Sequence, residues 1–247
     1  ISFQYYYGPK IKLIVNGWFN IKEGNVFTSE NINPFYISFH IKNDVDDYRM
    51  INHLKKYQPI GCRDKKTYNK LLKKGIKAYF SGCITTTLDI HYYQKENSRG
   101  KEILFTDFTF GYFPKADIFI KNLKAYDFAN VTYLSHGFSS NYSQIERFKI
   151  ADKILKRYAK ARLVITTKIH AALPCLALKT PVILVNNQYD NERFDGLYDL
   201  LNTIGINSTN KFEINININD SGLVYNSDKY LQYSSKLKKI MKNYIKE

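Results

Sequence analysis

The sequence predicts an α/β protein in which parallel sheets are covered by helices. Short apolar runs of strand length alternate with segments of helical period along the chain. The content of 44% hydrophobic and 24% charged residues is that of a globular protein with a core. Repeated strand–helix–strand units favour parallel sheets, which gives the α/β class.

The expected strands are short, apolar and separated by polar segments. They lie at residues 11–15, 35–39, 76–80, 103–105, 117–120, 131–134, 162–166 and 182–185. The stretch 213–220 (EINININD) alternates with a period of two, which fits either an edge strand or a low-complexity insertion.

The helices are expected between these strands, at 44–57, 64–74 and 144–160. Asp64 is a plausible cap for the second and Gly75 ends it. Ser143 and Glu146 form a capping box for the third. The tail, 228–246, reads as an amphipathic helix packed on the body with its lysines in solvent, and contact with a membrane surface is the alternative.

The length of 247 residues allows one large domain or two smaller ones. Strands and helices cycle on both sides of an irregular polar stretch, Asn122–Asn130. We therefore expect an amino-terminal domain at 1–130, a carboxy-terminal domain at 131–226 and a packed terminal helix at 227–247.

Most of the basic charge comes from lysine rather than arginine. The chain carries 37 Lys and Arg against 22 Asp and Glu, a net charge of +15, and 30 of the 37 are Lys. Nucleic-acid readers favour Arg, so the sequence favours anionic ligands over nucleic acid. The longest apolar stretch, 171–185, is too short to cross a bilayer and contains Lys179.

The three cysteines lie far apart and outside any C-x-x-C pair, as in a protein with reduced, buried thiols. No leader pattern opens the chain. We therefore expect a cytoplasmic protein. No metal-binding motif and no dinucleotide or P-loop glycine pattern is present, so neither a metal nor a cofactor is implied.

The segment 160–185 holds the strongest chemical signal. Arg162–Thr166 reads as a strand and Ala171–Leu178 as a helix, and Pro174 is tolerated only in a first helical turn, which places the helix start near Ile169–Ala171. Thr166, Thr167, Lys168 and His170 then lie in the strand-to-helix turn. The positive end of the helix favours an anion there. The alternative is a structural His beside a solvated Lys.

A second turn of this kind is Gln58–Asp64, with Arg63 as its cation. Two such turns suggest half-sites that face a cleft. A surface ion pair between Arg63 and Asp64 is the alternative. Among the other histidines, His136 is the best candidate because it directly follows the strand at 131–134.

These segments resemble the polysaccharide pyruvyl transferases. The likeness rests on ARLVITTKIHAALPCLALKTPVILV and on five further ordered pieces: NGWF (16–19), PFYISFHI (34–41), PIGCRDKKT (59–67), AYFSGCITTTL (78–88) and RFDGLYDLLN (193–202). It spans residues 11 to 205. It implies two Rossmann-like domains in a GT-B-like arrangement, with phosphoenolpyruvate bound between them and pyruvate transferred to a sugar or glycan, often as a ketal.

The resemblance also implies roles for particular residues. His170 matches the family's active-site His, and Arg63 matches an Arg that holds the donor. Thr167 and Lys168 share the donor turn, although Arg is commoner than Lys at position 168. Asn16, in the NGWF piece, and His136 are further candidates.

Two departures from the family pattern are visible. The strand and Gly-Asp segment that normally precede NGWF are missing here, so we expect either a shortened amino-terminal domain or a front segment that this sequence does not include. The Lys that follows the Pro-Val strand in many relatives is also missing. We expect Arg193 to replace its charge; the alternative is that Arg193 pairs with Asp195 or Asp199.

The sequence therefore predicts a transferase that moves pyruvate from phosphoenolpyruvate to a glycan. Its two rivals are a nucleotide-sugar glycosyltransferase and a non-catalytic carbohydrate-binding remnant.

Overall fold

The computed structural model describes residues 3–19, 27–42, 45–93, 99–129, 131–137, 141–186, 194–206 and 211–246. The chain forms two compact units. Unit 1 comprises Ile1–Ile84, Asn191–Leu197 and Leu231–Glu247, and unit 2 comprises Thr85–Asp190 and Tyr198–Tyr230. Each unit has its own sheet of mainly parallel strands with helices between them, which confirms the α/β class.

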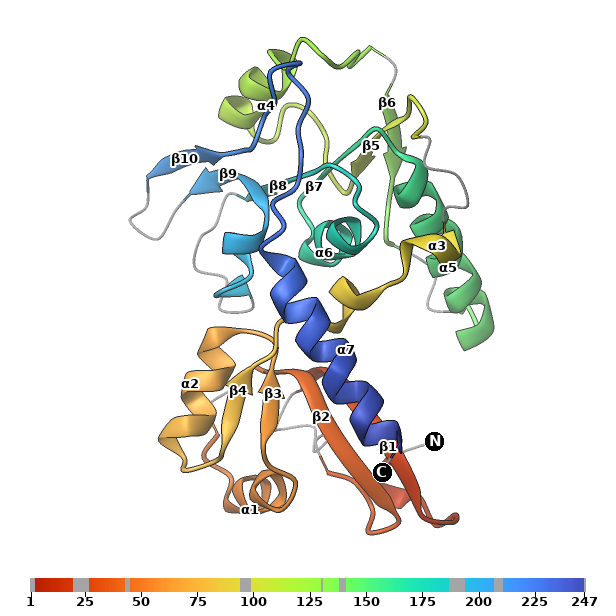
Figure 1. Ribbon diagram of the computed structural model, residues 1–247, viewed down its shortest axis with the longest axis vertical. Coiled ribbons are helices and arrows are strands. Elements are labelled where there is room, and N and C mark those ends of the chain that lie inside the picture. Colours follow the sequence, from red (N-terminus) through yellow and green to blue (C-terminus); the bar gives the residue numbers. More distant parts are fainter. Residues whose placement is uncertain are drawn as a thin grey trace. The chain divides into compact units, whose positions relative to one another are not determined.

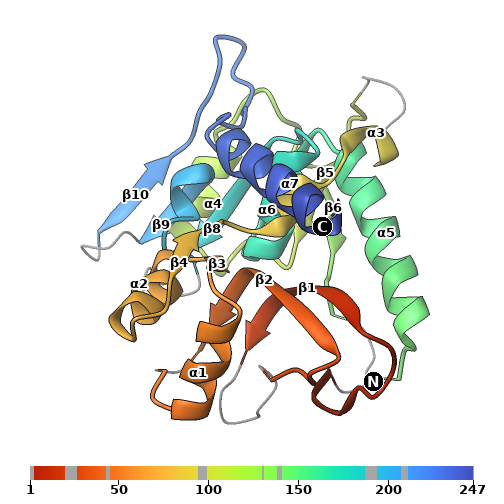
Figure 2. The ribbon, with the colours of Figure 1, turned by 60° about the horizontal axis from the view of Figure 1, so that its bottom comes forward.

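Unit 1 is built on a four-stranded parallel sheet. Its strands are β1 (Ile11–Phe19), β2 (Ile32–Ile41), β3 (Ile60–Cys62) and β4 (Ala78–Phe80), in that spatial order. The long strands β1 and β2 lie side by side in Figures 1 and 2. Because these strands are parallel, the connections that leave β2 and β3 start at the same carboxyl edge of the sheet.

A bulge interrupts the pairing of β1 with β2. Val15 pairs with Tyr36 and Gly17 with Phe39, so β2 has one residue more than β1 in this interval. Ser38 lies there with a φ of 52°, a left-handed conformation that a non-glycine residue rarely adopts. The extra residue lets Tyr36, Phe39 and Ile41 all join the hydrophobic core of the unit.

Two capped helices cover the core of unit 1. Helix α1 (Tyr48–Lys56) is capped by Asp47, and α2 (Lys65–Lys73) is capped by Asp64, as expected for the segment 64–74. Gly75 follows α2 with a φ of 67° and ends it, also as expected. The apolar faces bury Met50, Leu54 and Leu71 against the strands.

The terminal helix α7 (Tyr230–Lys246) packs on unit 1 by its apolar stripe. Tyr244 stacks on Phe35 of β2 with ring centroids 4.7 Å apart, and its hydroxyl donates to the carbonyl of Asn33 at 2.6 Å. At the other end of the helix, Tyr233 contacts Phe80. Figure 1 shows α7 running along β1 and β2. A helix therefore spans most of the segment 227–247, and its aromatic side chains contact β2 and β4.

Unit 2 has a six-stranded sheet in the order β10-β9-β8-β7-β5-β6. Its strands are β5 (Ile103–Thr106), β6 (Val131–Leu134), β7 (Leu163–Thr166), β8 (Val182–Asn186), β9 (Asn202–Ile206) and β10 (Phe212–Asn215). All pair in parallel except β10, which pairs antiparallel at the edge. The stretch 213–220 thus begins as the edge strand that one of its two interpretations predicted.

The order of these strands contains a topological switch. From β5 the chain moves to β6 on one side, and then crosses back to β7 on the other side of β5. In open α/β sheets, ligands bind where the strand order reverses in this way, at the carboxyl ends of the two strands. In unit 2 that place is the edge formed by the ends of β5 and β7.

Helices lie on both faces of this sheet. Ala116 and Ile120 of α4 (Pro114–Lys121) join Phe105, Ile165 and Ile183 in one core. On the opposite face, the hydroxyl of Tyr158 of α5 (Gln144–Lys160) hydrogen-bonds Thr106 at 3.2 Å. Helix α6 (Ile169–Ala177) contacts α5, β7 and β8. The short α3 (Ile90–Tyr93) contacts α5.

Two expectations differ from this arrangement. The strand expected at 117–120 is part of α4, because Pro114 starts a helix and its neighbours Ala116 and Ile120 are buried at helical spacing. The boundary expected near residue 130 falls inside the second sheet, since β5 pairs with both β6 and β7. The units instead divide at Ile84. The helix expected at 144–160 is confirmed with its capping box.

We predict a pH-dependent loss of stability from His53. Burial first, and then Lys56, lowers the pKa of His53 to about 4, while its Nε2 lies 2.7 Å from the hydroxyl of Tyr36. The unfolded chain therefore takes up a proton below about pH 6.5 that the folded chain refuses until about pH 4. Stability should fall as the pH drops through this window.

Solvent screening of the partly exposed ring keeps the expected loss to about 1–2 kcal/mol. Urea unfolding of the wild type and of His53→Gln at several pH values measures it, because Gln retains an acceptor for Tyr36 but does not titrate. Equal pH dependence in the two proteins would contradict the prediction.

Candidate active site

His170 stands out on a helix that is otherwise buried. Eight of the nine residues of α6 are buried, and His170 in its first turn is the exposed one. The helix begins at Ile169, as expected. Pro174, however, is its sixth residue rather than part of its first turn, so the carbonyl of His170 receives no amide from position 174. The expected start is thus confirmed although the position of the proline is not.

The turn before α6 is fixed by hydroxyl groups. The amide of Lys168 donates to Oγ1 of Thr166 at 3.0 Å, and Oγ1 of Thr167 donates to the carbonyl of Asp107 at 2.8 Å. Thr167 thus uses its hydroxyl hydrogen to hold the turn rather than to reach a ligand. Lys168 occupies the cap position of α6 but makes no side-chain cap bond, and its side chain is exposed.

A chain of polar contacts lies beside this turn. The carboxylate of Asp107, which follows β5, is 3.3 Å from Nδ1 of His136, which follows β6. Nε2 of His136 lies 2.8 Å from the hydroxyl of Tyr158, which donates to Thr106. Burial is the main cause that lowers the pKa of His136; Asp107 opposes it and the positive charge of Lys168 adds to it. The side chain of Lys168 is therefore close enough to His136 for its charge to affect the pKa of the ring.

These residues form a basic corner at the carboxyl edge of the unit 2 sheet. Lys168 and His170 frame the start of α6, where helix amides and the macrodipole favour negative charge. His136 lies at the end of the neighbouring strand. Lys168 and His170 stand at the switch between β5 and β7, the usual ligand position in such a sheet.

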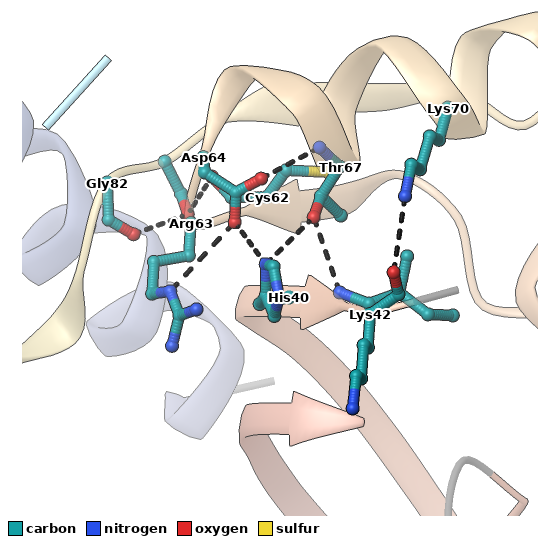
Figure 3. Close-up of polar contacts among 10 residues, drawn as sticks. His40, Lys42, Cys62, Arg63, Asp64, Thr67, Lys70 and Gly82 are labelled. Atoms are coloured by element: carbon teal, nitrogen blue, oxygen red, sulfur yellow. Dashed lines mark hydrogen bonds and ion pairs between the residues drawn. The ribbon is translucent and has the colours of Figure 1, made fainter. Parts of the chain in front are cut away.

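Unit 1 has a buried polar cluster at the carboxyl edge of its own sheet (Figure 3). Nδ1 of His40, at the end of β2, is 2.6 Å from Oδ2 of Asp64, with the two side chains 2% and 0% exposed. The other oxygen of Asp64 accepts from the amide of Thr67 at 2.8 Å and so caps α2. One carboxylate therefore holds both a histidine and a helix end.

Arg63 belongs to this cluster. Its Nε lies 3.9 Å from Oδ2 of Asp64, and its side chain is 5% exposed. The pair is thus buried, whereas the alternative interpretation placed it on the surface. A buried guanidinium next to a carboxylate is held in a defined orientation, which suits a group that recognises a carboxylate or phosphate.

The other candidate residues are distributed as follows. Asn16 is exposed on β1. Arg193 lies outside the described residues, so its expected role stays a prediction. The sequence did not single out His40, Asp64 as a partner of His40, Asp107 or Tyr158. The position of Asp107 directly after a strand was the available signal.

Two observations concern metals and membranes. In the described segments, His, Cys, Asp and Glu side chains do not gather in groups that could hold a metal ion. No helix in that part of the chain is long and apolar enough to span a bilayer. Cys62, Cys83 and Cys175 are all buried thiols without disulfide partners.

The fold is an α/β protein, with Lys168 and His170 at the switch of a parallel sheet. A family model for the polysaccharide pyruvyl transferases matches residues 10–189. The chain therefore belongs to the polysaccharide pyruvyl transferase family. No curated protein and no solved structure is similar enough to count as a match.

We predict that Asp64→Asn, which removes the charge but keeps an acceptor oxygen, destabilises the fold less than Asp64→Ala, which removes both. Asp64→Asn keeps an acceptor for the amide of Thr67, because Asn is as good a cap as Asp. Asp64→Ala loses the cap, worth about 1 kcal/mol, and removes the buried carboxylate that faces His40 and Arg63. Breaking a buried ion pair by removing one partner typically costs about 3–5 kcal/mol. Urea denaturation should rank the stabilities as wild type, then Asn, then Ala.

Asp47→Ala provides the matched control, since Asp47 caps α1 with no buried charge beside it. It should destabilise less than Asp64→Ala. If the two alanine variants lose the same stability, the buried cluster contributes nothing beyond the cap.

Proposed function

We propose that this protein transfers pyruvate from phosphoenolpyruvate to hydroxyl groups of a sugar or glycan, forming a ketal. One observation carries the proposal for this chain. The exposed His170 lies in the first turn of an otherwise buried helix that has Lys168 at its cap position, in a member of this family. Phosphoenolpyruvate carries a phosphate and a carboxylate, so such a corner suits it.

The chemistry demands proton transfers that a histidine can perform. The methylene carbon of phosphoenolpyruvate gains a proton and becomes a methyl group, and the central carbon accepts oxygen from two acceptor hydroxyls. The bond between the central carbon and the phosphate oxygen breaks, and phosphate leaves with that oxygen. Of the two hydroxyl protons, one balances the new C–H bond and the other leaves with the phosphate.

In this scheme His170 acts as the acid or base, because an imidazole exchanges protons near neutral pH. Lys168 stabilises the charge on the departing phosphate, assisted by the first amides of α6. Arg63 is a further donor ligand by its match to the family motif, and its planar guanidinium would bind a carboxylate or phosphate with two hydrogen bonds. Arg193 is proposed as an additional cation. These residue roles are proposals.

The finer description of the protein follows from the same resemblance. We propose that the two units correspond to two Rossmann-like domains of a GT-B-like enzyme, and that the enzyme works in the cytoplasm on a glycan acceptor. No cofactor other than the donor substrate is part of the proposed reaction.

Calorimetric titration of phosphoenolpyruvate into the protein tests donor binding. The titration is run beside inorganic phosphate and a nucleotide sugar. Preferential binding of phosphoenolpyruvate supports the proposal. Preferential binding of the nucleotide sugar would point to a glycosyltransferase instead. Glycan binding with no affinity for phosphoenolpyruvate would indicate a carbohydrate-binding remnant.

We predict that His170→Ala reduces turnover by about 10²–10⁴-fold, the usual contribution of a general acid or base. Phosphate release from phosphoenolpyruvate in the presence of a glycan mixture measures turnover. Mass spectrometry should find products heavier by one pyruvic acid less one water. His91→Ala, at an exposed histidine of α3, is the matched control and should retain activity. Full activity of His170→Ala would refute the assignment.

We also predict that Lys168→Ala weakens the binding of phosphoenolpyruvate by about tenfold or more, since a charge-assisted contact contributes about 1.5–3 kcal/mol. Lys153→Ala, at an exposed position of α5, controls for the loss of one positive charge. Calorimetry compares the two. An equal effect of both variants would mean that only the general charge of the protein matters.

A further inference from the structure

Asp107 has a strained backbone at the switch of the unit 2 sheet. Its φ of 48° lies in the left-handed region, which non-glycine residues rarely occupy. Such strain persists only where the surrounding contacts hold the residue in place. Asp107 directly follows β5, and its contacts reach the two strands on either side of β5.

The backbone of Asp107 links these neighbours. Its amide donates to the carbonyl of Leu134, the last residue of β6, at 2.9 Å. Its carbonyl accepts the hydroxyl of Thr167, which follows β7, at 2.8 Å. The left-handed conformation lets one residue bond to both sides. The turn that carries Lys168 is thereby tied to the end of β5.

The carboxylate of Asp107 holds the loop after β6. It accepts from the hydroxyl of Ser135 at 3.0 Å and from the backbone amide of His136 at 3.4 Å. It also lies 3.3 Å from the ring nitrogen Nδ1 of His136. On its other side the ring of His136 meets the hydroxyl of Tyr158 at 2.8 Å. The histidine is therefore clamped from both of its nitrogens.

We propose that Asp107 is the positioning residue of the donor site: it fixes the Thr167–Lys168 turn with its carbonyl and His136 with its carboxylate. The inference rests on the proposed function, since the donor is the anion bound at this corner. Asp107 itself needs no contact with the donor. It acts through two neighbours that face the corner from different strands.

Two variants test the carboxylate arm, and the second also loosens the backbone that carries the carbonyl arm. Asp107→Asn keeps the backbone conformation, because Asn tolerates positive φ, but it removes the charge that faces His136. Asp107→Gly also tolerates positive φ and removes the whole side chain. Lys179→Gly is the matched control. Lys179 has a φ of 53° after the other end of α6 and experiences the same relief of strain.

We expect both Asp107 variants to melt close to the wild type and to bind phosphoenolpyruvate about tenfold more weakly. Lys179→Gly should bind normally. In NMR titrations of the histidine rings, Asp107→Asn should lower the pKa of His136, because the remaining charged neighbour, Lys168, opposes protonation. A purely structural role would reduce the melting temperature and leave donor affinity intact, and that outcome would overturn the proposal.

A failure of the proposed function can be distinguished from a failure of the positioning role of Asp107. If the wild type does not bind phosphoenolpyruvate, amide hydrogen exchange at residues 167–170 in the ligand-free protein decides the positioning role. Exchange should be faster in Asp107→Gly than in the wild type and unchanged in Lys179→Gly. Unchanged exchange in Asp107→Gly would refute the inference.

Discussion

The parallel pairing of β5 with β7 is the constraint on which the rest of the site depends. Thr106 pairs with Thr166, so both strands end at the same level. The residues that follow, Asp107 and Thr167, are then close enough for a hydrogen bond. The connections from these two strands lead to opposite faces of the sheet, α4 on one side and α6 on the other. The carboxyl edge between them is left for polar groups.

The burial of α6 is the second constraint on the geometry of the site. A helix with eight of nine residues buried has little freedom to tilt or rotate, because any rotation would expose apolar surface. His170 and the cap residue Lys168 therefore keep a fixed position at the edge of the sheet. The same packing directs the positive end of the helix to that edge. Hydrophobic packing thus sets the geometry of a polar site.

Local signals in the sequence were enough for much of this description. The caps at Asp64 and Ser143 and the start of α6 depend on a few neighbouring residues, and all are confirmed. The run 117–120 (DIFI) was wrong as a strand because so short a run, with three apolar residues, fits either period, and the deciding residue, Pro114, lies outside the run.

The polar clusters could not be predicted in this way because they depend on strand register. His40 and Asp64 meet because Phe39 pairs with Cys62, which aligns the ends of β2 and β3. Asp107 and His136 meet through the corresponding pairing of Thr106 with Leu134. The unit boundary was misplaced for the same reason: only the sheet order shows that 103–134 belongs with the strands that follow.

The proposed site at the start of α6 can be tested by mapping the backbone amides of isotopically labelled protein by NMR during addition of phosphoenolpyruvate. We expect saturable shifts centred on the amides of Lys168, Ile169 and His170, with smaller shifts at His136. Binding that leaves these amides unmoved and shifts a different part of the chain would contradict the proposed site.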